Sequence, residues 1–154
     1  MPSLQERLAS VLRGVVSVDE EPDGGLTVRH DGTFASLRVV TIADDLDLVS
    51  LTQILAWDLP LSKKVSEQVT KYARDSNFGS VTMVEKVADK AAQRNSGKGA
   101  AKTASRTVSR TVSRTVDVML RYNFPGAGLT DDALRTLILL VLGTGSEIRR
   151  AITA

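Results

Sequence analysis

Apolar residues recur at the spacing of a helix in three parts of the chain. The first part predicts a helix over residues 3–16, and Ser3 starts it with the Ser-x-x-Glu pattern of a capping box. The second predicts a helix over about residues 60–75, with Pro60 in its first turn. The third begins after Thr130, a residue type that caps helix N-termini. We therefore expect three helices.

The segments between these helices alternate apolar and polar residues, as strands do when one face is buried. We expect five strands, separated by turn residues such as the Asp31-Gly32 pair. The strands cover residues 26–30, 33–42, 46 to about 57, 81–87 and 117–124. The order α-β-β-β-α-β-β-α predicts an α+β fold with one antiparallel sheet and helices packed on it.

Charge is divided unevenly along the chain. Seven of the 20 basic residues lie between residues 90 and 114, a stretch that holds none of the 18 acidic residues. The stretch is rich in Ala, Ser, Gly and Thr, and such a composition cannot bury a core by itself. We expect a single domain over residues 1–154, interrupted by a flexible basic insertion at about 88–114. Three tandem Ser-Arg-Thr-Val repeats from Ser105 favour extended structure and should lengthen the fifth strand backward.

The composition excludes several kinds of site. The chain has no Cys, which excludes disulfides and Cys-ligated metals, and its one His, His30, excludes a site with two His ligands. The longest apolar run, residues 137–142, is far shorter than the roughly 20 residues that span a bilayer. The first residues do not have the layout of a signal peptide. We therefore expect a cytoplasmic protein without a membrane span.

Three phrases, which cover most of the chain outside the insertion, resemble a known family. They are FASLRVVTIADDLDLVSLTQILAWDLP, FGSVTMVE and DVMLRYNFPGAGLTDDALRTLILLVLGTG. In order, spacing and apolar pattern the chain resembles the bacterial YbjN-like family, which has the type III secretion chaperone-like fold. The resemblance implies a small protein-binding domain, often a homodimer, with no catalytic residues to carry over. The basic insertion departs from the family's pattern, so the resemblance implies no particular client.

The last helix and the end of the third strand supply candidate partner-binding residues. Six consecutive apolar residues, 137–142, cover every direction around a helix, so we expect a surplus apolar face that meets a second subunit or a client peptide. A central core helix within one monomer is the alternative. Trp57, the only tryptophan, would anchor a binding edge or pack against the following helix. The hydrophobic candidates are Trp57, Leu137, Leu139, Leu140 and Leu142.

The polar clusters favour structural interpretations over chemistry. His30 stands beside a turn, and the sequence assigns it no nucleophile or orienting group, so we interpret it as a surface residue. Asp44, Asp45 and Asp47 lack the spacing of a calcium loop, so we expect solvated carboxylates in a strand connection. Residues 143–146 read Gly-Thr-Gly-Ser after a helix and lack a P-loop lysine, so we expect a helix kink or break. We expect no catalytic residue, no metal and no cofactor.

Charge and apolar pattern together leave two functions open. We first expect a non-enzymatic protein-interaction or chaperone-like module that binds a partner segment through an exposed sheet surface or edge and a hydrophobic helix face. The alternative is a binder of nucleic acid or another acidic partner, with strongly salt-dependent affinity. Its contacts would be Lys90, Arg94, Lys98, Lys102, Arg106, Arg110 and Arg114. The acidic stretch over residues 19–47 would receive a basic peptide or the chain's own insertion, or form a solvated edge.

Overall fold

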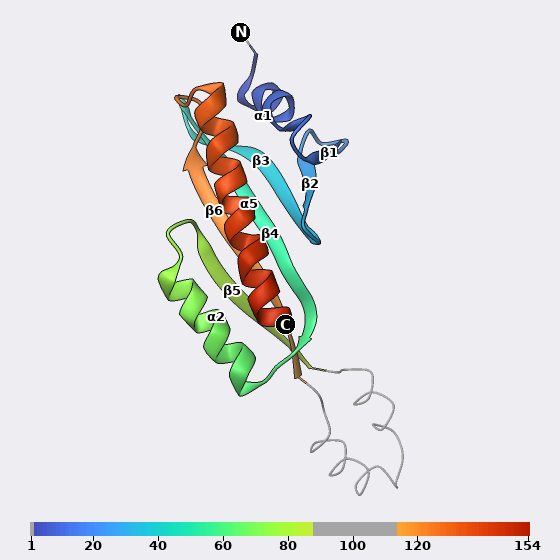
Figure 1. Cartoon of the computed structure of the whole chain (residues 1–154). Coiled ribbons are helices and arrows are strands. Elements are labelled where there is room, and N and C mark those ends of the chain that lie inside the picture. Colours follow the sequence, from blue (N-terminus) through green and yellow to red (C-terminus); the bar gives the residue numbers. More distant parts are fainter. Residues whose placement is uncertain (1, 88–113) are drawn as a thin grey trace, which may run out of the picture.

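The computed structural model describes residues 2–87 and 114–154, which form three helices and six strands (Figure 1). In chain order the elements are α1 (Leu4–Leu12), β1 (Ser17–Glu20), β2 (Leu26–His30), β3 (Thr33–Ala43), β4 (Leu46–Pro60), α2 (Lys63–Asp75), β5 (Ser80–Val87), β6 (Arg114–Pro125) and α5 (Asp131–Thr153). This order confirms the α+β class and adds one strand to the five that the sequence predicts.

The strands form one sheet in the order β1-β2-β3-β4-β6-β5, and every neighbouring pair is antiparallel. The single antiparallel sheet is therefore confirmed. The predicted helix over residues 3–16 is too long, because α1 ends at Leu12 and β1 follows it. Strand β1 buries little, since Val18 is its only half-buried residue. Without an apolar alternation, nothing in its sequence distinguishes it from a loop.

Strand β4 is paired along different lengths on its two sides. Its pairing with β3 begins at Phe34↔Ile54, whereas its pairing with β6 extends to Pro60↔Thr115. Pro60 therefore ends a strand, and the predicted start of the following helix at about residue 60 is too early. Helix α2 begins after Ser62, whose hydroxyl accepts a hydrogen bond from a backbone amide of the first turn at 3.1 Å.

Strands β5 and β6 pair without irregularity, from Ser80↔Arg121 to Val87↔Arg114. The predicted insertion therefore connects two strand ends that lie directly opposite each other. Arg114, Thr115 and Val116 of the third repeat belong to β6, as the predicted backward lengthening of that strand requires. Residues 88–113, with the remainder of the insertion, lie outside the described residues.

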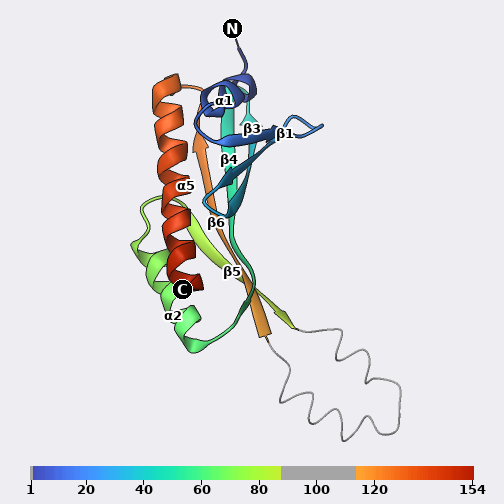
Figure 2. The same cartoon turned by 45° about the vertical axis from the view of Figure 1, so that its right-hand side comes forward.

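The three helices pack on one face of the sheet (Figure 2). Along β3, β4 and β6, residues with buried side chains alternate with residues whose side chains are more exposed. The buried side chains point toward the helices and form a single core between sheet and helices. Val118 and Leu120 of β6 are fully buried there, as their alternation predicts. Within residues 2–87 and 114–154, no helix combines the length and the apolar content needed to cross a membrane.

Helix α5 runs unbroken through the Gly-Thr-Gly-Ser segment, so the predicted break is wrong. The glycine at position 145 is explained by the close approach of Gln53, a fully buried residue of β4. A Cβ atom on Gly145 would lie 1.9 Å from Gln53 Oε1. Gln53 Nε2 donates to Thr33 Oγ1 at 2.8 Å and to Leu142 O at 3.2 Å. Gly145 therefore makes room for a polar contact between sheet and helix.

Candidate functional site

No helix of the described residues covers the opposite face of the sheet, which we call the open face (Figure 2). Several large apolar side chains are exposed on it, although isolated exposed apolar residues are ordinary on protein surfaces. They are Phe34, Val40, Leu46, Trp57 and Val84, between 40% and 59% exposed. Contiguous exposed apolar side chains are typical of a surface that meets another molecule, and among these five residues the rings of Phe34 and Trp57 are in contact.

Two aromatic residues lie together on this face. The rings of Phe34 and Trp57 stack with centroids 6.0 Å apart and an interplanar angle of 24°. The guanidinium of Arg29 lies 5.8 Å from the Phe34 ring centroid, a cation–π distance. Trp57 is 59% exposed, and its ring neighbour lies on β3. The alternative that Trp57 packs against α2 is therefore not the contact that the structure records.

The stacked rings border a groove of about 260 Å³, which we call the aromatic groove. It is lined by Gly32, Phe34, Ile54, Leu55, Ala56, Trp57 and Arg149. The groove lies at the end of the β3–β4 pairing, where β4 extends beyond Ile54. Beyond that residue, the edge of β4 that faces β3 has no strand neighbour within the described residues. One backbone carbonyl there, Leu55 O, has a side-chain partner, because it accepts a 2.8 Å hydrogen bond from Arg149 of α5.

The apolar run of α5 divides between the core and the surface. Leu142 is fully buried, so it is not available to a partner at the surface of this chain. Leu137 and Leu139 are half-buried, and Leu140 is 49% exposed. The helix periodicity explains the division, because Leu142 shares the inward face with Ile138. Of the four leucines predicted to bind a partner, Leu140 is the one that is broadly exposed.

Four of the eight acidic side chains of residues 19–47 form ion pairs within the domain. The ion pairs are Asp19 with Arg29, Glu20 with Arg13, Asp23 with Arg38 and Asp31 with Arg150. The Gly25 amide, followed by the Arg38 guanidinium, lowers the pKa of Asp23 below its ordinary value. Glu21, Asp44, Asp45 and Asp47 form no ion pair within residues 2–87 and 114–154, so the solvated edge and the receptor for a basic peptide both remain predictions.

A small charge cluster lies where β5 and β6 approach residues 88–113. Lys86 Nζ lies 2.7 Å from an oxygen of Asp58 and 3.0 Å from one of Asp117. These carboxylates, Asp58 first, raise the pKa of Lys86. Burial opposes ionisation of Asp117, but the Asp58 amide and the Lys86 ammonium outweigh it and lower the pKa of Asp117. The next cation of this region, Arg114, is exposed on β6.

His30 takes part in packing between sheet and helix. Its Nδ1 lies 2.8 Å from the hydroxyl oxygen of Ser146 on α5. Ser146 is 1% exposed, so this hydroxyl is closed to a substrate and the pair does not form a usable nucleophilic site. Across residues 2–87 and 114–154, no three His, Asp or Glu side chains gather as metal ligands would. His30 is therefore half-buried and structural, where the sequence predicts a surface residue.

The basic candidates lie almost wholly outside the described residues. Lys90, Arg94, Lys98, Lys102, Arg106 and Arg110 fall within residues 88–113. Sequence reasoning named Trp57 but missed Phe34, whose partner is distant in sequence. Phe34 stands among alternating residues at the start of a predicted strand, so the alternation could predict that its side chain points outward. The sequence could not predict that Phe34 pairs with Ile54, because strand register is not a local pattern.

Comparisons with known proteins give no relative for this chain. A scan against protein-family models, a search of curated proteins and a search of solved structures each found no match. The class that the structure itself defines is an α+β domain with an antiparallel sheet covered on one face.

Proposed function

We propose that this protein is a non-enzymatic, chaperone-like interaction module that binds an extended apolar segment of a partner protein. The observation that carries the proposal is the stacked pair of Phe34 and Trp57, which is exposed and borders a groove at the edge of β4 that β3 leaves unpaired. Binding energy at protein interfaces concentrates in a few aromatic residues that fill or border pockets. Here the rings are held by two paired strands, so little conformational entropy is lost when a partner binds.

The shape of the groove favours an extended segment as its occupant. The aromatic groove lies beside the part of β4 that β3 does not pair, so a bound chain would run along a strand and place alternate side chains in the groove. Strand β5 offers a second, more regular edge, with eight residues and no bulge in its pairing to β6. Its outward side chains Thr82 and Val84 continue the open face.

The resemblance to the YbjN-like family supports the finer parts of the proposal. It favours a secretion-chaperone-like fold, a bacterial cytoplasmic location and a homodimer. The apolar residues of the open face and Leu140 of α5 are the surfaces on which a second copy would pack. Light scattering at tens of micromolar protein measures this state directly, and a monomeric mass there would contradict the homodimer.

Trp57 makes the proposal testable by intrinsic fluorescence, because it is the only tryptophan. The probes are tryptophan-free peptides of twelve residues with Leu, Ile or Phe at alternate positions, and matched peptides with Ser at those positions. We expect the apolar peptides to shift the Trp57 emission. We expect Phe34→Ala to lower the affinity for the apolar peptides about tenfold, the equivalent of about 1.4 kcal/mol.

Two control variants separate this site from other apolar surfaces. Val84→Ala removes an equally exposed side chain from the same face, and Leu140→Ala does so on α5; neither should weaken the peptides more than about twofold. Equal loss in all three variants, or equal binding of the Ser-substituted peptides, would refute binding at the aromatic groove. Binding that disappears at high salt would instead favour the alternative, an acidic partner held by the basic insertion.

A further inference from the structure

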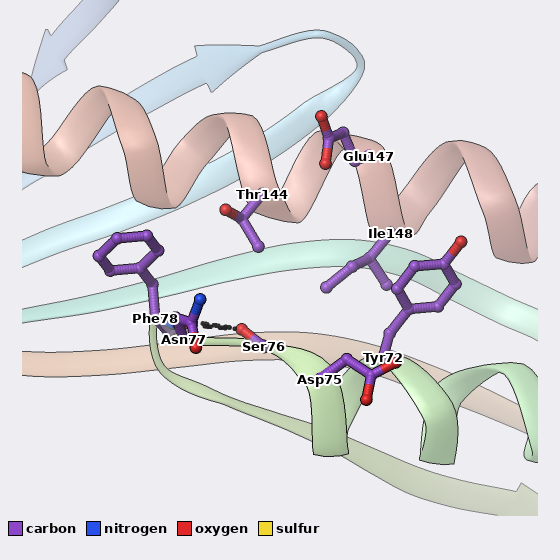
Figure 3. Close-up of a pocket in the computed structure, with 8 residues that line it drawn as sticks. All are labelled: Tyr72, Asp75, Ser76, Asn77, Phe78, Thr144, Glu147 and Ile148. Atoms are coloured by element: carbon purple, nitrogen blue, oxygen red, sulfur yellow. Dashed lines mark hydrogen bonds between the residues drawn. The ribbon is translucent and has the colours of Figure 1, made fainter.

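A second hollow, of about 290 Å³, lies between the end of α2 and the middle of α5 (Figure 3). The end of α2 and the loop after it form one wall, and one side of α5 forms the other. Its lining residues are Tyr72, Asp75, Ser76, Asn77, Phe78, Thr144, Glu147 and Ile148. We call it the α2–α5 pocket. Its volume is at the lower end of the roughly 300–1,000 Å³ typical of ligand sites, which suits one long side chain.

The loop wall of this pocket is fixed in place. The Ser76 hydroxyl donates to Phe78 O at 3.0 Å and accepts from Phe78 N at 3.3 Å. Gly79 follows at a φ of +82°, and a Cβ there would lie 2.5 Å from Arg121 O of β6. Because the loop is tied to itself and pressed against the sheet, the pocket exists before any ligand arrives.

The electrostatics of the pocket favour a cation. Asp75 and Glu147 place two carboxylates on opposite walls, and α2 ends here with the negative end of its helix dipole. Asp75 has one basic neighbour, Arg74, at 3.8 Å, and both side chains are well exposed, so this pair contributes little. No basic side chain of residues 2–87 or 114–154 lies within 4.0 Å of the Glu147 carboxylate.

The remaining walls are aromatic and apolar. The Tyr72 and Phe78 rings both line the hollow, and Ile148, 2% exposed, lies beside Tyr72 on the α5 wall (Figure 3). Phe78 is held by an edge-on contact with Tyr122, with centroids 6.4 Å apart. Aromatic faces attract cations, and they attract arginine most often because its planar guanidinium also stacks on them.

We propose that the α2–α5 pocket binds an arginine side chain of a basic protein segment. The methylene stem would lie on Ile148 and the Tyr72 ring, and the guanidinium would meet the Glu147 carboxylate, while the Asp75 carboxylate on the opposite wall adds to the negative potential. Half of the eight acidic residues of the 19–47 region already have basic partners, and none of the eight lines this pocket. The proposal does not depend on the aromatic groove, which is built from other residues.

The probe is a peptide that the chain's own sequence suggests, SRTVSRTVSR, as in residues 105–114. Its affinity for the full-length protein is measured by calorimetry in low salt, alongside peptides with Gln or Lys at the arginine positions. A second full-length protein carries Arg106→Gln and Arg110→Gln, so that its own repeats do not compete. We expect binding of the arginine peptide, weaker binding of the lysine peptide, and none of the glutamine peptide.

Matched variants locate the binding. The double variant Asp75→Asn with Glu147→Gln should lower the affinity for the arginine peptide at least about tenfold. Tyr72→Leu should also lower this affinity, whereas Tyr72→Phe, which keeps the aromatic ring, should not. Glu67→Gln neutralises an exposed carboxylate elsewhere on α2 and should leave affinity within about twofold.

Three results would overturn the proposal. They are the absence of arginine-peptide binding to both proteins, equal loss in Glu67→Gln and in the pocket variants, and equal affinity of the glutamine peptide. Phe34→Ala separates the two proposals. If that variant abolishes arginine-peptide binding while the pocket variants retain it, the peptide occupies the aromatic groove and the α2–α5 pocket is not its site.

Discussion

The two glycines of α5 should respond in opposite directions to the same substitution. Gly143 and Gly145 lie two residues apart in one helix, and neither has a positive φ. A Cβ on Gly143 would meet nothing within 4 Å, whereas a Cβ on Gly145 would lie 1.9 Å from Gln53 Oε1. Gly143→Ala and Gly145→Ala therefore differ in packing while sharing the same gain in helix propensity.

The magnitudes follow from these contacts. Ala in place of Gly in a helix interior is worth about 0.8–1.0 kcal/mol, so Gly143→Ala should stabilise by nearly that amount. In Gly145→Ala the Gln53 side chain has to move. It is fully buried, and its Nε2 would lose hydrogen bonds to Thr33 and to Leu142 O. Overpacking and lost buried hydrogen bonds outweigh the propensity gain, for a net loss of about 2–4 kcal/mol.

The assays are urea denaturation and thermal melts, both monitored by circular dichroism at one protein concentration for all variants, because association would shift stability. For a domain of this size, 1 kcal/mol corresponds to about 2–4 °C in melting temperature, so the thermal melts of the two variants should differ by well over 5 °C. Gln53→Ala alone should also destabilise, because it leaves a cavity and removes the buried hydrogen bonds to Thr33 Oγ1 and Leu142 O.

The double variant tests the mechanism itself. If the Gln53 side chain causes the loss in Gly145→Ala, then Gln53→Ala with Gly145→Ala should be more stable than the sum of the single changes predicts. We expect a coupling of about 1–3 kcal/mol. Additive losses would refute the steric explanation, and so would a Gly145→Ala protein as stable as Gly143→Ala.

Three further predictions concern the sheet. Asp117→Asn should destabilise the fold near neutral pH and progressively less as pH falls below about 4. The pKa of Asp117 is lowered in the fold, so its carboxylate stabilises the fold only while it is ionised, and melts of both proteins across this pH range check this. Val118→Ala should cost about 2–4 kcal/mol in denaturation, since the side chain is fully buried, and a loss below 1 kcal/mol would remove it from the core. Deletion of residues 88–104 should change the melting temperature little, because Val87 and Arg114 already pair and closure entropy changes only about 0.6 kcal/mol per doubling of loop length; a large loss would make the segment structural.

Features that depend on neighbours in sequence were predictable. The Ser3 and Thr130 caps are present, with their hydroxyls accepting backbone amides at 3.1 Å. The alternation of residues 117–124 identified both the strand and its buried face. In each case a local pattern of a few residues states which groups must be bonded or buried, and the fold agrees with it.

Features that depend on strand register were not predictable. The aromatic pair exists because Phe34 is placed opposite Ile54, and Gly145 is needed only because Gln53 lies beneath it. The α2–α5 pocket likewise joins Tyr72 and Glu147, which are far apart in the chain. A one-residue shift in register would move Phe34 or Gln53 to the other face of the sheet. No local pattern specifies which residues of α2 and α5 meet.

The position of α5 constrains how this protein folds during synthesis. Its buried side chains close the helical face of strands made about 90 or more residues earlier, as the Gln53 bond to Leu142 O spans 89 residues and the His30 contact with Ser146 spans 116. A ribosome adding about 5–20 residues per second leaves that apolar face uncovered for several seconds. Nascent chains arrested before α5 should therefore recruit holding chaperones or aggregate, and a premature stop before Leu134 should yield no stable fold.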